Sequence, residues 1–160
     1  MEVANLFMKI DGIKGSSTDN DFKDWIPVLS FSNKVHRSVE LDNSQIKSGS
    51  IYFSEAQIVK EFDKSSSDIY GALLNGAVIK EIEIAQIVEH NKKKVEQHRY
   101  KFTNCVISDM DKGLISGEKP RCESIVFSFS TISMTTYTAE QDGSSTKSGP
   151  FVYDIVKNKS

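Results

Sequence analysis

Side chains that could do chemistry are few and scattered in this chain of 160 residues. The three histidines, the usual general bases and metal ligands, are His36, His90 and His98, and none stands in a motif such as a nucleophile elbow. His90 and His98 flank a lysine-rich turn, so a hairpin would bring them together for metal binding or acid–base chemistry. The same placement is typical of solvated turn histidines, which is the interpretation we favour.

Two other pairs of residues invite a chemical hypothesis. Glu81 and Glu83 alternate along an expected strand, at the roughly 6–7 Å spacing of some glycosidase carboxylates, but any solvent-facing strand has this pattern. Cys105 and Cys122 have no histidine at ligand spacing, so they do not describe a zinc site. We interpret both as reduced, buried or half-buried thiols, and a disulfide between them stays open. We therefore expect no catalytic, cofactor-binding or metal-binding residue, and no enzyme.

Composition limits the partners. A net charge of −2 and a pI near 5.9 argue against a nucleic-acid binder, which would carry a basic excess. No run approaches the roughly 18 apolar residues that cross a bilayer, so we expect no membrane insertion. The first residues, MEVANLFMKIDG, lack the basic region and long apolar core of a signal peptide. We expect a protein made in the cytoplasm that, if exported, leaves by a route that reads no such signal.

Alternation of apolar and polar residues predicts antiparallel strands, each with one dry and one wet face. The clearest examples cover residues 78–88, 100–106 and 124–130, where Ile, Val and Phe alternate with Glu, Lys and Ser. Between residues 51 and 62 the apolar positions change parity, which suggests a bulge near Glu55. The chain is long enough for one domain, 1–160, and its pattern predicts a mostly-β sandwich or small barrel with one helix.

The helix is predicted within the segment IVKEFDKSSSDIYGALLNG, residues 58–76. Three serines at 65–67 offer hydroxyls that cap the first N–H groups of a helix, and Gly76 supplies the left-handed residue that ends one. The pattern therefore predicts a helix over about residues 67–75. The apolar positions expected to face the sheets are Ile69, Ala72 and Leu73.

The longest weakly patterned polar stretch covers residues 32–49. It is long for a simple connection, because antiparallel neighbours can be joined by as few as two residues. From its composition it is a functional arm or loop, or a locally disordered segment. Its scattered apolar residues are Val35, Val39, Leu41 and Ile46.

Several blocks of the chain resemble the haemolysin-coregulated protein (Hcp) family, which forms the inner tube of bacterial type VI secretion systems. VKEFDKSSSDIYGALLNG is similar to the family's lysine-bearing strand, Asp-Lys-Ser-Ser turn, short helix and closing Asn-Gly. MKIDGIKGSSTDNDFKDWIPVLSF, VIKEIEIAQI and ESIVFSFSTISMTTYTAEQDGSSTKSGPFVYD resemble its N-terminal strands, a middle strand and its later strands with a polar loop. The motif or structural residues that the resemblance marks are Trp25, Asp63, Lys64, Ser65, Ser66, Leu73 and Gly76.

The resemblance implies a fold and a task. The fold would be two antiparallel sheets forming a barrel-like sandwich, flanked by one short helix. Six copies would close into a ring, and rings would stack into a hollow tube through the arm at residues 32–49. A contractile sheath would surround the tube, a spike protein would cap it, and small effectors would travel in its lumen. The subunit would be assembled in the bacterial cytoplasm and then secreted.

A monomeric β-sandwich binding module, for example for sugars, is the alternative from another class. Exposed aromatic clusters would favour it, but the one tryptophan, Trp25, lies in a proline-bearing segment that we interpret as structural. The mass in solution distinguishes a module from a ring.

Overall fold

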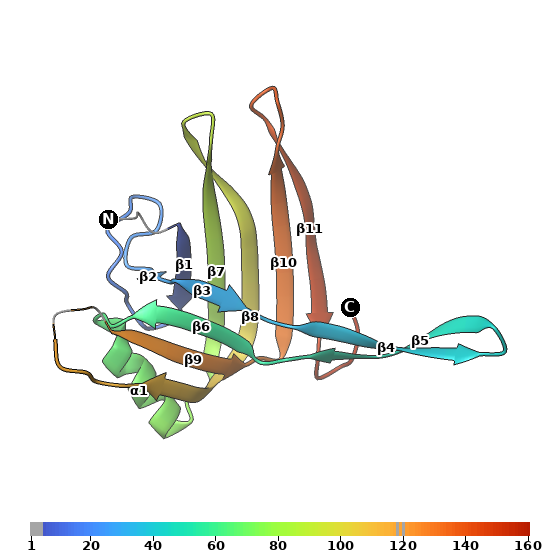
Figure 1. Cartoon of the computed structure of the whole chain (residues 1–160), viewed down its shortest axis with the longest axis horizontal. Helices are drawn as coiled ribbons and strands as arrows, with labels where there is room; N and C mark the ends of the chain where they lie inside the picture. The colour runs from blue at the N-terminus through green and yellow to red at the C-terminus, as the bar shows by residue number, and fades with distance from the viewer. Residues whose placement is uncertain (1–4, 118, 120) are drawn as a thin grey trace.

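The computed structural model describes residues 5–117, 119 and 121–160, and within these ranges the chain is mainly β with one helix (Figure 1). Two antiparallel sheets form the body, so the predicted fold class is confirmed. The first sheet has the order β2 (Ile26–Pro27), β1 (Leu6–Ile10), β7 (Ile79–His90), β8 (Lys93–Lys112), β10 (Thr131–Ala139) and β11 (Ser145–Asp154). The second sheet comprises β3 (Ser30–Ser32), β6 (Ala56–Glu61), β9 (Cys122–Ser128) and the end of β8.

The long strand β8 belongs to both sheets. Up to Cys105 it pairs with β7, and from Val106 onward it pairs with β9. Asn104 lies at the change with a left-handed φ of 51°, a conformation that asparagine tolerates better than most residues, so the strand turns from one sheet into the other. On the opposite side, β2 and β3 end the hydrogen-bonded order without pairing with each other. The sheet is therefore not closed, and the body is a sandwich with a barrel-like outline.

The core lies between the two sheets because the alternating apolar side chains of both point inward. Its fully buried members include Ile58, Ile82, Phe102 and Phe127. A smaller cluster lies on the other face of the first sheet, where Phe22 stacks on Phe7 with ring centroids 4.8 Å apart and Trp25 packs edge-on to Phe22. Trp25 thus attaches the loop before β2 to the sheet.

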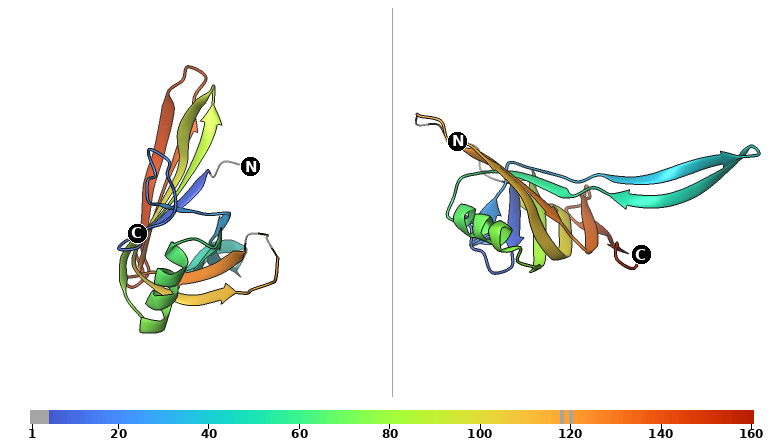
Figure 2. Two further views of the ribbon diagram at one scale, coloured as in Figure 1. Left: turned by 90° about the vertical axis from the view of Figure 1, so that its left-hand side faces the viewer. Right: turned by 90° about the horizontal axis from the view of Figure 1, so that it is seen from below.

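Two structures extend from this body (Figures 1 and 2). The hairpins of β7 with β8 and of β10 with β11 stand side by side above the second sheet, since β8 and β10 pair directly. The strands β4 (Val35–Asp42) and β5 (Gln45–Phe53) form a separate two-stranded ribbon that projects sideways, and we call these residues the arm. Among the described residues, no helix is long and apolar enough to cross a membrane.

The arm corrects two details of the sequence interpretation. Its second strand runs past residue 49 to Phe53, so the expected boundary divides β5. The parity change that suggested a bulge near Glu55 is a break between two strands: β5 ends at Phe53, and β6 begins at Ala56 in another sheet. The physical reason is that apolar and polar residues alternate separately in each strand, because β5 pairs with β4 in the arm and β6 pairs with β3 and β9 in the second sheet.

Candidate functional site

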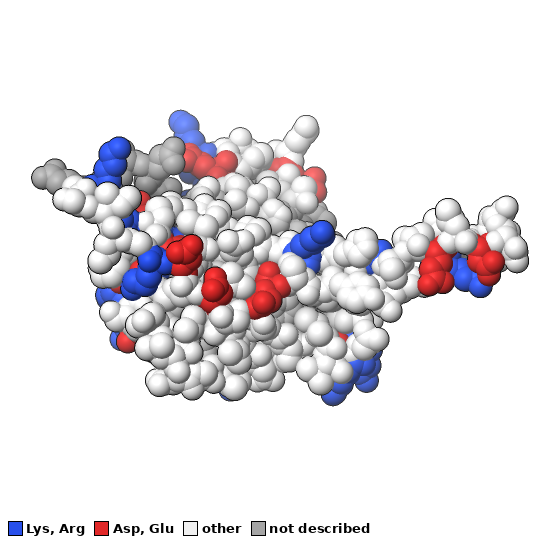
Figure 3. Space-filling view, turned by 60° about the horizontal axis from the view of Figure 1, so that its bottom comes forward, with Lys and Arg blue, Asp and Glu red and all other residues white. Residues whose placement is uncertain are grey.

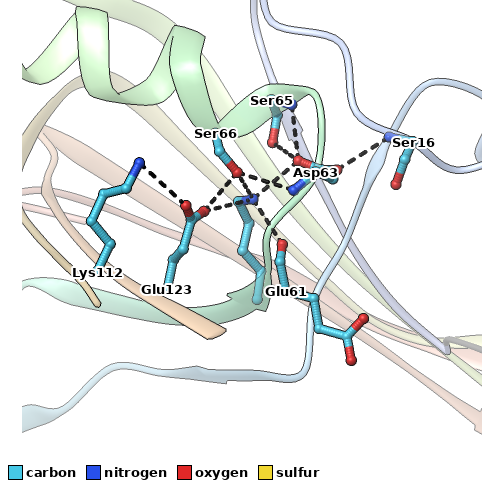
Figure 4. Close-up of polar contacts among 8 residues, drawn as sticks. Ser16, Glu61, Asp63, Ser65, Ser66, Lys112 and Glu123 are labelled. Atoms are coloured by element: carbon cyan, nitrogen blue, oxygen red, sulfur yellow. Dashed lines mark hydrogen bonds and ion pairs between the residues drawn. The ribbon is translucent and has the colours of Figure 1, made fainter. Parts of the chain in front are cut away.

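The Asp-Lys-Ser-Ser motif lies at a buried polar network where β6 meets α1 (Ser65–Asn75), drawn in Figure 4. Its centre is Lys60 of β6, whose side chain is 0% exposed. The Lys60 ammonium donates to Ser66 Oγ at 2.9 Å, to Asp63 Oδ1 at 3.0 Å and to the Glu61 carbonyl at 3.0 Å. A buried ammonium is tolerated only with such partners, so the folded protein needs these neighbours in order to keep Lys60 buried.

Glu123 of β9 supplies the second buried charge. It lies directly across from Lys60 in the strand register, and its Oε2 is 3.0 Å from the Lys60 ammonium. The same oxygen accepts a hydrogen bond from Ser66 Oγ at 2.7 Å, while Lys112 Nζ lies 3.6 Å from Oε1. Two ammonium groups therefore face two carboxylates, and the network joins β6, β9, β8 and the helix.

Asp63 closes the network toward the N-terminal loop. Its Oδ1 accepts hydrogen bonds from the backbone N–H and the hydroxyl of Ser65, and its Oδ2 accepts one from the Ser16 N–H at 3.3 Å. Burial raises the pKa of this carboxyl, but the hydrogen bonds from Ser65 and Lys60 outweigh it, so the pKa lies below its ordinary value. Asp63 is therefore held as a carboxylate.

The helix start differs from the one expected. We predicted a start near residue 67 with serine hydroxyls as caps, but α1 begins at Ser65. The Asp63 carboxylate receives the Ser65 N–H, while Ser66 Oγ accepts the Asp63 N–H at 3.1 Å. The capping oxygen thus comes from the aspartate upstream, and Ser65 and Ser66 are buried within the first turn. Asp63 followed three residues later by Ser66 was the signal available in the sequence.

The remaining motif residues position the helix. Lys64 is exposed and 4.0 Å from Asp24, whereas Ile69 is fully buried and Leu73 packs partly buried against the core. Gly76 has a φ of 61° and donates its N–H to the Leu73 carbonyl, which ends the helix as predicted. The network therefore fixes the helix and the N-terminal loop to the strands of the second sheet, and Ile69 of the helix packs into the core between the sheets.

In contrast to the network, where charged side chains are buried, the arm has apolar side chains that are exposed. Leu41 and Ile46 are 80% and 74% exposed, although they face each other directly across the two strands. Between them Asn43 and Ser44 both have positive φ, the geometry of a tight hairpin turn. Val35 and Val39 are 55% and 59% exposed. Every apolar residue singled out in this segment thus lies on the projecting ribbon, and none is buried.

Charged side chains on the arm gather near its end, as Figure 3 shows. Lys47 lies 3.5 Å from the Asp42 carboxylate and is paired in register with Glu40. All three are solvent-exposed, so these contacts contribute little to stability. The arm therefore carries an exposed aliphatic pair, Leu41 and Ile46, next to a polar turn, and its end has a small local acidic excess.

The sequence candidates for chemistry lie on strands. Glu81 and Glu83 face Lys101 and Arg99 in an ion-pair ladder on the first sheet, with Arg99 3.3 Å from Glu83. Cys105 and Cys122 are both free; burial raises the pKa of Cys105 to about 12.

Cys122 is exposed, which corrects the expectation that both thiols are at least half-buried. Its strand pairs at one end of the second sheet, where its side chain points away from the core. His90 and His98 lie on β7 and β8, are half-buried and line the same hollow, which corrects the expectation of solvated turn histidines. Over the part of the chain that the structure describes, no three His, Cys, Asp or Glu residues could hold a metal ion.

Together these features describe a β body with a buried ion network, from which an arm with exposed apolar residues projects (Figure 1). The family model described as "Type VI secretion system effector, Hcp" matches residues 7–136, so the chain belongs to the Hcp family. Hcp is a structural tube protein family and not an enzyme family, and its members form type VI secretion tube oligomers. No curated protein matches this chain.

Solved structures agree over nearly the whole chain. A structure described as that of a type six secretion system protein is 24% identical, with a TM-score of 0.88 covering 98% of this chain and 99% of that one. Hcp1 from Salmonella typhimurium is 24% identical, with a TM-score of 0.75 over 98% and 99%. A type VI secretion system effector from Yersinia pestis is 26% identical, with a TM-score of 0.66 over 94% and 100%.

Proposed function

We propose that this protein is the ring-forming subunit of a type VI secretion tube, in which six copies close laterally and rings stack through the arm. The observation that carries the proposal is the arm itself. Its strands pair only with each other in the sheet order, and its exposed aliphatic pair, Leu41 and Ile46, lies outside the body. Exposed apolar residues on a projecting ribbon are typical of a surface that is covered in an assembly.

The contacts that close the ring would be made by the side surfaces of the body. A subunit that presents two different, complementary side surfaces associates head to tail, and such contacts close into a ring when the rotation allows. The arm is then free to reach the next ring. The same subunit would contact the sheath on the outside of the tube and the spike protein at its tip.

The lumen would be lined by the ladder of charged residues on the first sheet. In one register row, Lys9 pairs with Glu83, Glu83 with Lys101, and Lys101 with Ser133. Charges of both signs alternate there with small hydroxyl side chains, and exposed ion pairs of this kind are weak. A surface of this type would hold a small effector loosely enough to release it. The subunit would be assembled in the bacterial cytoplasm and then secreted with its cargo.

The mass in solution tests the proposal. Light scattering behind a sizing column is expected to give about six times the 17.9 kDa of one chain. A monomeric β-sandwich binding module would instead elute at 17.9 kDa, and a clean monomer at micromolar concentration would contradict the tube subunit.

A further inference from the structure

An apolar groove of about 630 Å³ lies between the base of the arm and the open end of the hairpin of β10 with β11, where β10 begins and β11 ends, opposite the turn. The Phe53 and Tyr153 rings meet there with centroids 5.2 Å apart, and Phe151 is 62% exposed at its edge. Ligand-binding hollows in proteins are about 300–1,000 Å³ and lined mainly by apolar side chains, and this groove falls in that range. The residues that form it include Val35, Ile51, Phe53, Tyr100, Met134 and Phe151.

The arm tip has the matching chemistry. Leu41 and Ile46 stand side by side on the last register pair but one before the turn, and together they form an aliphatic knob. The tight turn at Asn43 and Ser44 holds the two strands in register, so the knob is preorganised and little conformational freedom is lost when it docks. The chain therefore carries both an exposed aliphatic knob and an open apolar groove.

The knob cannot occupy the groove of its own chain. Val35 at the base of β4 forms part of the groove wall, and Leu41 lies six residues further along the same extended strand, roughly 20 Å away at the usual strand rise. The ribbon leads away from the body, as Figures 1 and 2 show. A second copy of the chain is therefore the partner that brings a knob of the right chemistry to this groove.

Charge favours the same pairing. The arm tip carries Glu40 and Asp42 against the single Lys47. The segment 155–160, whose Ser160 lines the groove, carries Lys157 and Lys159 and no acidic residue. An acidic tip approaching this basic segment is attracted, and such complementarity sets the orientation of the partners more than their affinity.

We propose that the Leu41 and Ile46 knob of one copy seats in the groove between the arm base and the hairpin of β10 with β11 of a second copy. The proposal rests on the proposed function and names the surface that receives the arm. Because knob and groove are different surfaces, each copy can give one arm and receive another, so the contact continues from copy to copy.

Disulfide trapping tests the contact. In a Cys122→Ser background, which removes the exposed thiol, Ile46→Cys and Phe151→Cys are combined in one chain and assembled protein is mildly oxidised. We expect a ladder of covalent oligomers on a non-reducing gel, which collapses on reduction. Cys105 is buried and its pKa is about 12, so it stays out of the reaction. Ile46→Cys or Phe151→Cys alone can give only dimers.

A matched variant places the second thiol elsewhere. Leu74 is 65% exposed on α1, so Ile46→Cys with Leu74→Cys offers an equally accessible partner outside the groove. A ladder with Leu74→Cys in place of Phe151→Cys would overturn the groove assignment. Rings and tubes that form normally but give no ladder with Phe151→Cys would overturn it too, while the proposed function stands. A monomer in light scattering without a ladder would contradict both.

A charge in the groove gives an independent test. Phe151→Asp is expected to abolish tubes while thermal melting stays unchanged, because this side chain is already 62% exposed. Val78→Asp, at a side chain 69% exposed and outside the groove lining, is the matched control and should leave tubes intact. Normal tubes with Phe151→Asp would overturn the proposal.

Discussion

The network around Lys60 buries charged side chains, whereas the arm exposes apolar ones. In the network, Lys60 and Glu123 are buried, Asp63 is nearly so and Lys112 reaches in from the surface, and each charge faces a charge of opposite sign. On the arm, charged side chains are solvated and the aliphatic ones are exposed. The first arrangement is complete within one chain, whereas the second leaves apolar surface exposed, which we propose a partner covers. Folding and assembly therefore depend on different residues and can be disturbed separately.

Breaking the network should have the largest effect on stability. Lys60→Met leaves Glu123 and Asp63 buried without their shared cation, and removing one partner of a buried ion pair costs about 3–5 kcal/mol. Chemical denaturation of the variant against the parent protein measures this difference. Lys64→Met is the matched control, because Lys64 is exposed and should lose less than about 0.5 kcal/mol. Equal losses from both lysines would contradict the role of the network.

The helix should show a graded loss along one face. Ile69 is fully buried, so Ile69→Ala should cost about 2–5 kcal/mol, and Leu73→Ala should cost less because Leu73 is only partly buried. Asp68→Ala should cost about 0.3–1 kcal/mol through the helix dipole. Melting temperatures of the three variants measure the series. If Asp68→Ala were as damaging as Ile69→Ala, the assigned buried face would be wrong.

A smaller effect is expected from pH. The Asp63 pKa is lowered in the folded protein, so the folded state binds fewer protons than the unfolded chain near the ordinary value of 3.8. The stability that Asp63 contributes is fully present above that value and is lost as pH falls below it toward the folded pKa. Urea denaturation at pH 5 and pH 3 should therefore show a steeper acid loss in the parent protein than in Asp63→Asn. Parallel losses in the two proteins would remove Asp63 as a source of acid sensitivity.

The sequence predicted much of this fold because the alternation in β7, β8 and β9 repeats over many residues. It did not predict the network, since Lys60 and Glu123 lie on strands that are distant in sequence and become neighbours only through the pairing of β6 with β9. A lysine within an apolar strand was the visible signal. The expected serine caps failed in part for the same reason: Ser66 donates to Glu123, a buried partner from a distant strand, while Ser65 bonds to its near neighbour Asp63.

The arm shows the complementary limit. Its length and polarity distinguish it from a simple connection, and the scattered apolar residues Val35, Val39, Leu41 and Ile46 mark it in the sequence. Its pairing as a hairpin ending at Phe53 could not be predicted, because only two of its register pairs, Val35 with Phe53 and Leu41 with Ile46, place apolar residues directly opposite each other. Exposed strands do not need the alternation that burial imposes, so the pattern that identified the other strands is weak here.

The most direct measurement of the separation between folding and assembly is electron microscopy of the double variant Val39→Asp with Leu41→Asp, combined with light scattering. Both side chains are exposed in the single chain, so the variant should fold and form rings of normal mass. Tubes should be absent, because each new carboxylate would have to be buried unpaired in the contact between rings. Tubes of normal length would contradict the assignment of the arm to stacking, and loss of the ring would place the arm in the lateral contact instead.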